Sequence, residues 1–146
     1  MSEPHYVFDT EALIAFLYAE PGHEVVAARL REIEAGGATG AVAETNAAEV
    51  LYLVARIEGD DGVPTAASLR AADRDVRSFD RRGVTLARAD WRLAAEIKAD
   101  GSCSLADAYA VALAVDHGAT LVVGADDDFD DLPVGVELER FRTEPG

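Results

Sequence analysis

The chain has 146 residues, of which 49% are hydrophobic, so its composition excludes a disordered chain and favours one globular domain over residues 1–146. Its 28 acidic and 13 basic side chains give a net charge of −15, which argues against a general nucleic-acid binder because phosphates repel carboxylates. A single cysteine excludes an internal disulfide. The sequence shows neither a basic leader nor an apolar run near the ~20 residues of a membrane span, so we expect a cytoplasmic protein.

Short apolar runs typical of buried strands alternate with segments in which apolar residues recur every three or four positions, as in amphipathic helices. In chain order, the sequence predicts strands at 6–8, 38–43, 84–86, 120–123 and 136–138, with helices between the first four and an acidic loop before the last. Candidate N-caps of these helices are Thr45 or Asn46, Asp90 and Ser104. This alternation predicts an α/β fold with a mostly parallel sheet of four to five short strands, covered by helices on both faces.

Four acidic residues that lie far apart in the chain fall at the same end of this predicted sheet. Asp9 and Asp126 follow predicted strands, whereas Glu49 and Asp107 lie in the first turns of predicted helices. Ligands of open parallel sheets bind beyond the carboxyl ends of the strands, so all four carboxylates can reach one crevice. Carboxylate oxygens without histidine or cysteine partners suit Mg²⁺ or Mn²⁺.

Each of these acids also has a structural interpretation. Asp9 is placed to cap the first helix, Glu49 lies where a helix dipole favours an acid, and Asp107 is a capping partner for Ser104. Asp126 belongs to the acid-rich loop ADDDFDDL, in which solvated charge is ordinary. The order and placement of the four together favour a metal site over four separate structural roles.

Four segments of the sequence resemble the PIN-domain ribonucleases, and most closely the VapC-type toxins of toxin–antitoxin pairs. VFDTEALIAFL, TNAAEVLYL, SLADAYAVALA and LVVGADDDFDDL are similar, in order and spacing, to the acidic motifs of that family. Asp9, Glu49, Asp107 and Asp126 stand at the acidic positions of these motifs. One departure is Gly124, where the family usually carries a threonine or serine whose hydroxyl helps to position the acidic cluster.

The resemblance implies a PIN-like three-layer fold and Mg²⁺-dependent cleavage of RNA phosphodiester bonds by these four catalytic acids. Asp9, Asp107 and Asp126 would be metal ligands, Asp128 is a further candidate ligand, and Glu49 would bind a second metal ion or orient the attacking water. A small antitoxin that blocks the active site and a homodimer are implied as partners. An inactive PIN-like RNA-binding or scaffold module and a housekeeping PIN nuclease remain alternatives.

Two other phosphoryl-transfer folds of this shape fit the sequence poorly. A haloacid-dehalogenase-like phosphatase requires D-x-D after its first strand, but this chain has Asp9, Thr10 and Glu11 there. A receiver domain requires a lysine late in the chain, but the only lysine, Lys98, lies in a predicted helix.

A stripe of arginines offers this acidic chain a surface for RNA. Arg70, Arg74, Arg77 and Arg81 recur at four, three and four residues, so they line one face of a predicted helix. Two interpretations are open: a track for phosphates, or a solvated face paired with nearby aspartates. The acidity and scarcity of lysine are typical of salt-adapted proteins, so we expect a halophilic source, where a Debye length of ~3 Å at ~1 M salt would screen RNA from the surface charge.

Overall fold

A computed structural model of the chain describes residues 3–101 and 103–144. The strands are β1 (His5–Phe8), β2 (Thr39–Ala43), β3 (Val84–Ala87), β4 (Thr120–Val123) and β5 (Glu137–Arg140). The helices are α1 (Thr10–Leu17), α2 (His23–Glu34), α3 (Glu44–Ile57), α4 (Ala66–Arg81), α5 (Trp91–Asp100) and α6 (Leu105–His117), with a short 3₁₀ helix η1 (Asp127–Phe129). All five predicted strands are therefore present, although β5 begins and ends slightly later than the sequence indicated.

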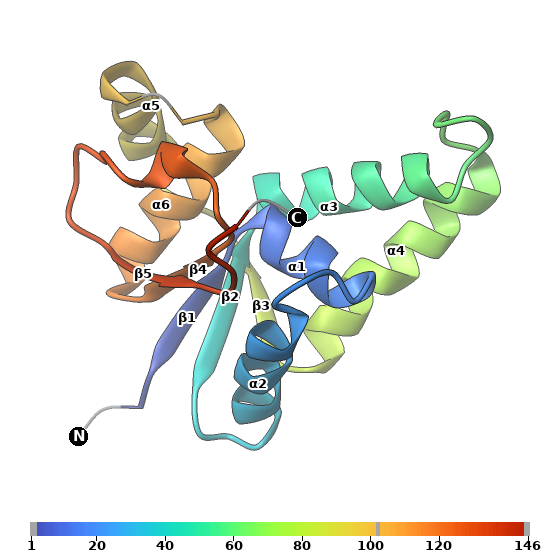
Figure 1. Cartoon of the computed structure of the whole chain (residues 1–146), viewed down its shortest axis with the longest axis horizontal. Coiled ribbons are helices and arrows are strands. Elements are labelled where there is room, and N and C mark those ends of the chain that lie inside the picture. Colours follow the sequence, from blue (N-terminus) through green and yellow to red (C-terminus); the bar gives the residue numbers. More distant parts are fainter. Residues whose placement is uncertain (1–2, 102, 145–146) are drawn as a thin grey trace.

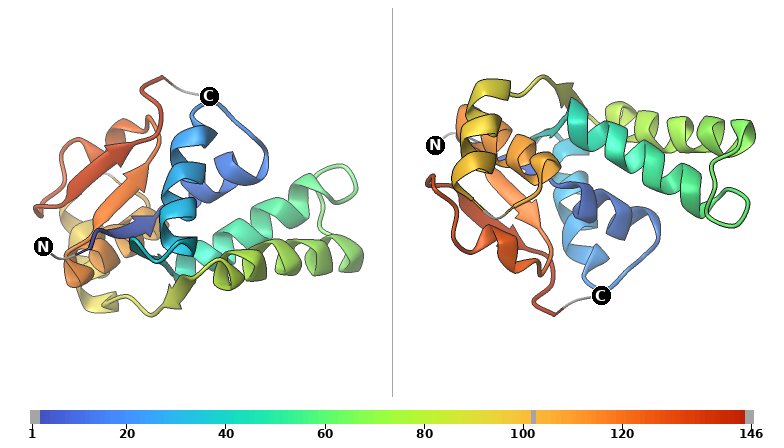
Figure 2. Two further views of the ribbon diagram at one scale, coloured as in Figure 1. Left: turned by 90° about the horizontal axis from the view of Figure 1, so that it is seen from below. Right: turned by 90° about the horizontal axis from the view of Figure 1, so that it is seen from above.

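The five strands form one sheet in the order β3-β2-β1-β4-β5, and every neighbouring pair is parallel (Figure 1). Since parallel strands all point the same way, the segments that leave β1, β2, β3 and β4 start at the same edge of the sheet. This carboxyl edge lies at the top of Figure 1, and the right-hand view of Figure 2 looks onto it from above. The predicted α/β class is confirmed, with a sheet that is wholly parallel.

Two hydrophobic clusters lie on opposite faces of the sheet, because successive strand residues point to opposite sides. Phe8 and Val122 pack with apolar residues of α1 to α4, whereas Val7 and Leu121 pack with those of α5 and α6. The fold therefore has three layers, as predicted. None of the helices in the described part of the chain is both long and apolar enough to span a membrane.

The helix starts agree with two of the predicted caps and disagree with a third. Asp90 and Ser104 cap α5 and α6 as predicted, because each side chain accepts hydrogen bonds from backbone N–H groups of the first turn. Helix α3 begins at Glu44, directly after β2, so the prediction of Thr45 or Asn46 as its N-cap is wrong. Asn46 is fully buried and forms hydrogen bonds to other elements instead.

Helices α3 and α4 pack against each other and project together away from the sheet (Figures 1 and 2). We call residues 44–81 the α3–α4 hairpin. Helix α4 starts with Thr65 as its N-cap, where the side chains of Thr65 and Ser68 each accept a hydrogen bond from the other's backbone N–H. The base of the hairpin lies beside the carboxyl edge of the sheet, so its first turn contributes to whatever site forms there.

Candidate functional site

A pocket of about 380 Å³ lies at the carboxyl edge of the sheet, and most of its polar lining is acidic. Its residues come from the end of β1, from α1, α3 and α6, and from the loop after β4. The acids that line it are Asp9, Glu11, Glu49, Asp107, Asp126 and Asp128. The structure thus brings together the four predicted catalytic acids and the additional candidate ligand, and it adds Glu11 to them. We call this the acidic pocket.

Three of these carboxylates form a compact group that is able to hold a cation. Asp107, Asp126 and Asp128 each have a carboxylate oxygen within 4.8 Å of the other two. Asp126 also accepts a hydrogen bond of 2.9 Å from the backbone N–H of Asp128, which fixes the loop in this arrangement. An all-oxygen donor set of this kind suits Mg²⁺ or Mn²⁺.

Asp9 is the most deeply buried acid of the pocket, with 3% of its surface exposed. It stands at the N-cap position of α1, but its side chain accepts no capping hydrogen bond. Its Oδ1 atom has no hydrogen-bond partner among the described residues, which leaves a buried carboxylate oxygen to be satisfied by something else. The structure therefore does not support helix capping as the role of Asp9.

Burial is the main reason that the pKa of Asp9 lies well above its usual value, and the negative charge of Asp107 is the second. The charges of Glu11 and Glu49 raise the pKa of Asp9 further. The pKa of Asp107 is also raised, first by burial and then by the charges of Asp126 and Glu49, against hydrogen bonds with Ser104 that lower it. A bound divalent cation would remove these penalties, so the residues fit a metal ion.

The position of Asp107 is compatible with both of the roles that the sequence left open. Its backbone N–H donates a 3.1 Å hydrogen bond to the hydroxyl of Ser104, so the start of α6 is capped as predicted. Its carboxylate nevertheless lines the acidic pocket and belongs to the compact group. The cap thus holds the carboxylate at the mouth of the pocket.

A buried asparagine ties together the helices that carry the acids. The Nδ2 atom of Asn46 donates hydrogen bonds to Thr10 Oγ1 (3.0 Å) and to the carbonyl oxygen of Ala106 (3.2 Å). These contacts join the starts of α1, α3 and α6, which carry Glu11, Glu49 and Asp107. This role was not predictable from the sequence, because nothing local to Asn46 shows which partners the fold brings to it.

Gly124 lies against the carboxylate of Glu11. A Cβ atom placed on Gly124 would be 2.6 Å from the carboxylate atoms of Glu11, which is too close for two unbonded atoms. Glu11 in turn forms an ion pair with Arg142, whose side chain is 10% exposed. The space beside Gly124 is therefore filled by an acid of the pocket, and the absence of a side chain at this position makes that possible.

Arg140 fixes the acid-rich loop from the opposite side. Its guanidinium donates hydrogen bonds to the carbonyl oxygens of Gly124 (2.7 Å) and Asp126 (3.1 Å) and to the carboxylate of Asp130 (2.6 Å). Strand β5 therefore holds the loop that presents Asp126. This role was not predicted from the sequence, because Arg140 lies beyond the last predicted strand (136–138) and no local pattern pairs it with the loop.

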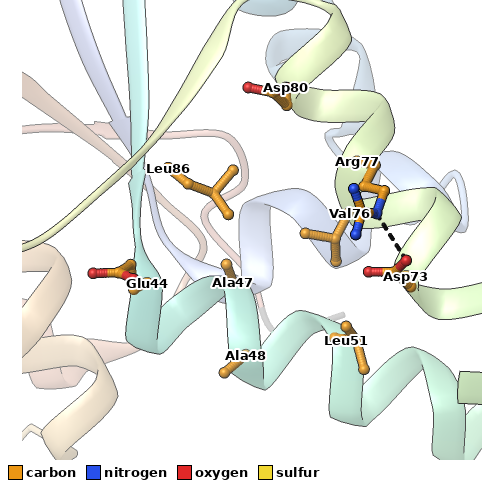
Figure 3. Close-up of a pocket in the computed structure, with 9 residues that line it drawn as sticks. All are labelled: Glu44, Ala47, Ala48, Leu51, Asp73, Val76, Arg77, Asp80 and Leu86. Carbon is orange, nitrogen blue, oxygen red and sulfur yellow. Dashed lines mark hydrogen bonds and ion pairs between the residues drawn. The ribbon is translucent and has the colours of Figure 1, made fainter.

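The predicted arginine stripe lies on α4, which contributes no residue to the lining described for the acidic pocket. Arg77 donates a 2.8 Å hydrogen bond to Asp73 and faces a second pocket, of about 480 Å³, between α3 and α4 (Figure 3). Arg70, Arg74 and Arg81 are exposed. Pairing with an aspartate is thus observed for Arg77, and RNA binding by the stripe stays a prediction.

The family model of the PIN domain matches residues 6–135. The chain belongs to the PIN domain family. The matched range includes every acid of the pocket, and it decides against the dehalogenase-like and receiver folds. No curated protein sequence shows a match to this PIN domain.

Several solved structures have the same fold as this chain. A chain in the crystal structure of VapBC2 from Rickettsia felis, bound to a DNA fragment from their promoter, has 15% sequence identity and a TM-score of 0.67, over 93% of this chain and 98% of that one. A chain of DNA-bound VapBC from Salmonella typhimurium has the same identity and TM-score, over 94% and 98%. FitAcB from Neisseria gonorrhoeae gives 16% identity and a TM-score of 0.57, over 93% and 97%. At such identities, the similarity shows a shared fold.

Proposed function

We propose that this PIN domain is a metal-dependent endoribonuclease and the VapC-type toxin of a toxin–antitoxin pair. The observation that carries the proposal is the buried Oδ1 atom of Asp9, which has no hydrogen-bond partner among the described residues and lies in a pocket with five other acids. A carboxylate kept in such surroundings costs stability unless a cation binds there. The family match and the fold of VapBC chains support a nuclease of this class.

The acids of the pocket divide into metal ligands and a helper. Asp9, Asp107 and Asp126 would hold Mg²⁺ or Mn²⁺, and Asp128 would join them through its place in the compact group. When bound, such an ion lowers the pKa of a water molecule and polarises a phosphoryl oxygen. Glu49, whose charge acts on both Asp9 and Asp107, would orient the attacking water or support a second ion.

A protein partner fits the exposed apolar surface of the α3–α4 hairpin. Tyr52, Ile57, Val63 and Leu69 are all more than 40% exposed there. The VapBC structures support the proposal that this chain binds a small antitoxin, and the homodimer is proposed from the resemblance of the sequence alone. Light scattering of the purified chain, alone and co-expressed with the product of the neighbouring gene, tests both assemblies.

The test of the activity is cleavage of single-stranded RNA in Mg²⁺ or Mn²⁺, with EDTA as the metal-free condition and with low and high salt compared. Asp9→Asn and Asp107→Asn should each reduce the rate at least about 100-fold, since even residues that only orient a metal ligand contribute about 10- to 100-fold. Asp131→Asn is the matched control, because Asp131 is exposed in the same loop but does not line the pocket. Wild-type rates in the two pocket variants would remove these acids from the mechanism.

An inactive PIN-like RNA-binding or scaffold module is the second candidate, and Gly124 is the observation that favours it. If the hydroxyl that is usual at this position is needed for activity, the chain binds RNA without cutting it. The wild-type chain would then cleave no RNA under any metal or salt condition, while still binding RNA in a filter assay.

A further inference from the structure

A smaller pocket of about 300 Å³ at the carboxyl edge of the sheet is lined by aromatic and arginine side chains. Trp91 is the first residue of α5, Tyr109 lies on α6, and Arg88 follows the end of β3. Glu44 and Thr45 from the first turn of α3 complete the polar part of the lining. Its volume is at the lower end of the ~300–1,000 Å³ typical of small-ligand sites. We call it the aromatic pocket.

The aromatic pocket and the acidic pocket are neighbours, because helices α3 and α6 line both. Thr45 of the aromatic pocket and Glu49 of the acidic pocket are four residues apart on α3, which is slightly more than one helical turn, or ~6 Å along the axis. On α6, Asp107 lines the acidic pocket and Tyr109 lines the aromatic one, but residues two apart on a helix point to different sides, so the shared face of α3 is what places the two pockets next to each other. A chain that places one phosphate among the acids can therefore reach the aromatic pocket with an adjoining nucleotide.

Trp91 presents an indole ring that nothing in the described structure covers completely. It is 54% exposed, although tryptophan has a large apolar surface to bury. The guanidinium of Arg92 lies 5.3 Å from the ring centroid, so one ring contact is with a cation. Exposed aromatic rings beside arginines are the surfaces on which unpaired nucleobases stack.

The arginines around Trp91 supply positive charge in a chain of net charge −15. Arg88 and Arg92 are both exposed, and neither forms an ion pair with a carboxylate among the described side chains. By contrast, Arg77 of the predicted stripe is paired with Asp73. The guanidinium groups of Arg88 and Arg92 are thus available for phosphate oxygens.

We propose that the aromatic pocket binds one unpaired nucleotide of single-stranded RNA, next to the phosphate that enters the acidic pocket. The base stacks on the indole of Trp91, and Arg88 pairs with the phosphate of the same nucleotide. The proposal rests on the nuclease function proposed above, and it makes Trp91 and Arg88 selectivity residues for single-stranded over paired RNA. Paired bases cannot reach the ring, because they are stacked within their own helix.

The fluorescence of Trp91 reports this contact directly, because it is the only tryptophan of the chain. The experiment titrates a single-stranded RNA oligonucleotide, and separately a fully paired hairpin of similar length, into the full chain. The buffer contains Ca²⁺ as the divalent cation, because Ca²⁺ also binds to carboxylates. The single strand should quench the emission at a concentration that matches its dissociation constant, and the hairpin should not. Arg88→Ala keeps the tryptophan and should shift the titration to higher RNA concentration.

The kinetics of RNA cleavage distinguish nucleotide binding by Trp91 from a purely structural role of this residue. Trp91→Ala should raise KM about 5- to 150-fold, the range for the loss of one base stack, with little change in kcat, and Trp91→Phe should restore most of the loss. The matched control is Glu96→Ala, since Glu96 is exposed on the same helix α5 but lines neither pocket, and it should leave KM unchanged.

The possible outcomes distinguish this site from the nuclease function. Unquenched emission and a wild-type KM for Trp91→Ala, in a chain that cleaves RNA, overturn the aromatic pocket and leave the nuclease intact. Quenching by the single strand without any cleavage keeps the pocket as an RNA-binding site and removes the nuclease. Emission that changes with protein concentration but not with RNA shows that a second copy covers Trp91, and that overturns the proposal as well.

Discussion

Gly124 lies directly beside the carboxylate of Glu11, one of the acids that line the acidic pocket. The carboxylate of Glu11 occupies the space that a side chain at position 124 would need. It stays there because Arg142, which is mostly buried, neutralises it. The space that a side chain at position 124 would fill is therefore occupied by a carboxylate of α1 that is paired with Arg142.

Gly124→Ser should destabilise the protein by about 1 kcal/mol, because the flexible side chain of Glu11 can move aside but must then leave its ion pair with Arg142. The double variant Gly124→Ser with Glu11→Ala should lose less than the sum of the two single variants, because the second change removes the clash. Urea unfolding of the four proteins measures the coupling. Gly135→Ser is the control, since a Cβ at Gly135 meets nothing within 4 Å, and its effect should stay within about 0.5 kcal/mol. Strict additivity would show that Glu11 does not occupy this space in solution.

The protonation state of Asp9 in the acidic pocket affects the stability of the folded protein. Burial and the charge of Asp107 raise the pKa of Asp9 in the folded protein above the ordinary value of 3.8, so the folded state holds the proton more tightly than the unfolded state. The stabilisation from this group is therefore complete at pH values below 3.8 and is lost as the pH rises through the raised pKa. At neutral pH without metal, a charged Asp9 costs stability.

Asp9→Asn should consequently be more stable than the wild type at pH 7.5 in EDTA, and the difference should shrink on acidification to pH 4. Mg²⁺ should reverse the order, because binding at 100 times the dissociation constant stabilises the wild type by about 2.7 kcal/mol. Thermal unfolding at both pH values, with EDTA or with Mg²⁺, measures these shifts, and Asp131→Asn controls for the loss of an exposed charge. If Asp9→Asn is the less stable protein at pH 7.5 in EDTA, the carboxylate has a structural partner and the metal argument fails.

At the scale of elements, the order of strands and helices was predictable from the sequence, but the side-chain contacts that join distant elements were not. Buried parallel strands leave continuous apolar runs, and helices between them leave a period near 3.6, so both signals are local. The placement of Asp9 and Asp126 after strands was predictable for the same reason. The contacts of Asn46 with Thr10, and of Glu11 with Gly124, join distant segments, and no local pattern reports them.

Asn46→Ala should therefore cost more than the loss of a helix cap. It removes one buried and one partly buried hydrogen bond and leaves the carbonyl oxygen of Ala106 without this partner, so we expect a loss of about 1–3 kcal/mol in the free energy of unfolding. Thr45→Ala, one residue earlier on α3, is the control and should be close to neutral, because α3 begins before it and Thr45 is not its cap. Urea denaturation measures the free energy of unfolding of both variants. A larger loss for Thr45→Ala than for Asn46→Ala would support Thr45 as the N-cap of α3.

For the whole molecule, the excess of acid is larger than the site can explain. The acidic pocket uses six acids, but the chain has 28 acidic residues and a net charge of −15. Most of them lie elsewhere, as do Glu96 and Asp116, which are exposed and outside the pocket. Such a charge destabilises the compact state through self-repulsion, and salt weakens that repulsion as the Debye length falls from ~10 Å at 0.1 M to ~3 Å at 1 M.

Raising KCl from about 0.1 to about 1 M should therefore raise the unfolding temperature by several degrees, where ~2–4 °C corresponds to about 1 kcal/mol for a domain of this size. A triple variant, Glu96→Gln, Asp116→Asn and Asp131→Asn, carries three fewer negative charges and should gain less from the same salt. Calorimetry in EDTA measures the unfolding temperature without a contribution from divalent metal ions. Equal gains for both proteins would mean that salt acts on hydrophobic burial rather than on charge, and the acidity would then need a cause other than salt adaptation.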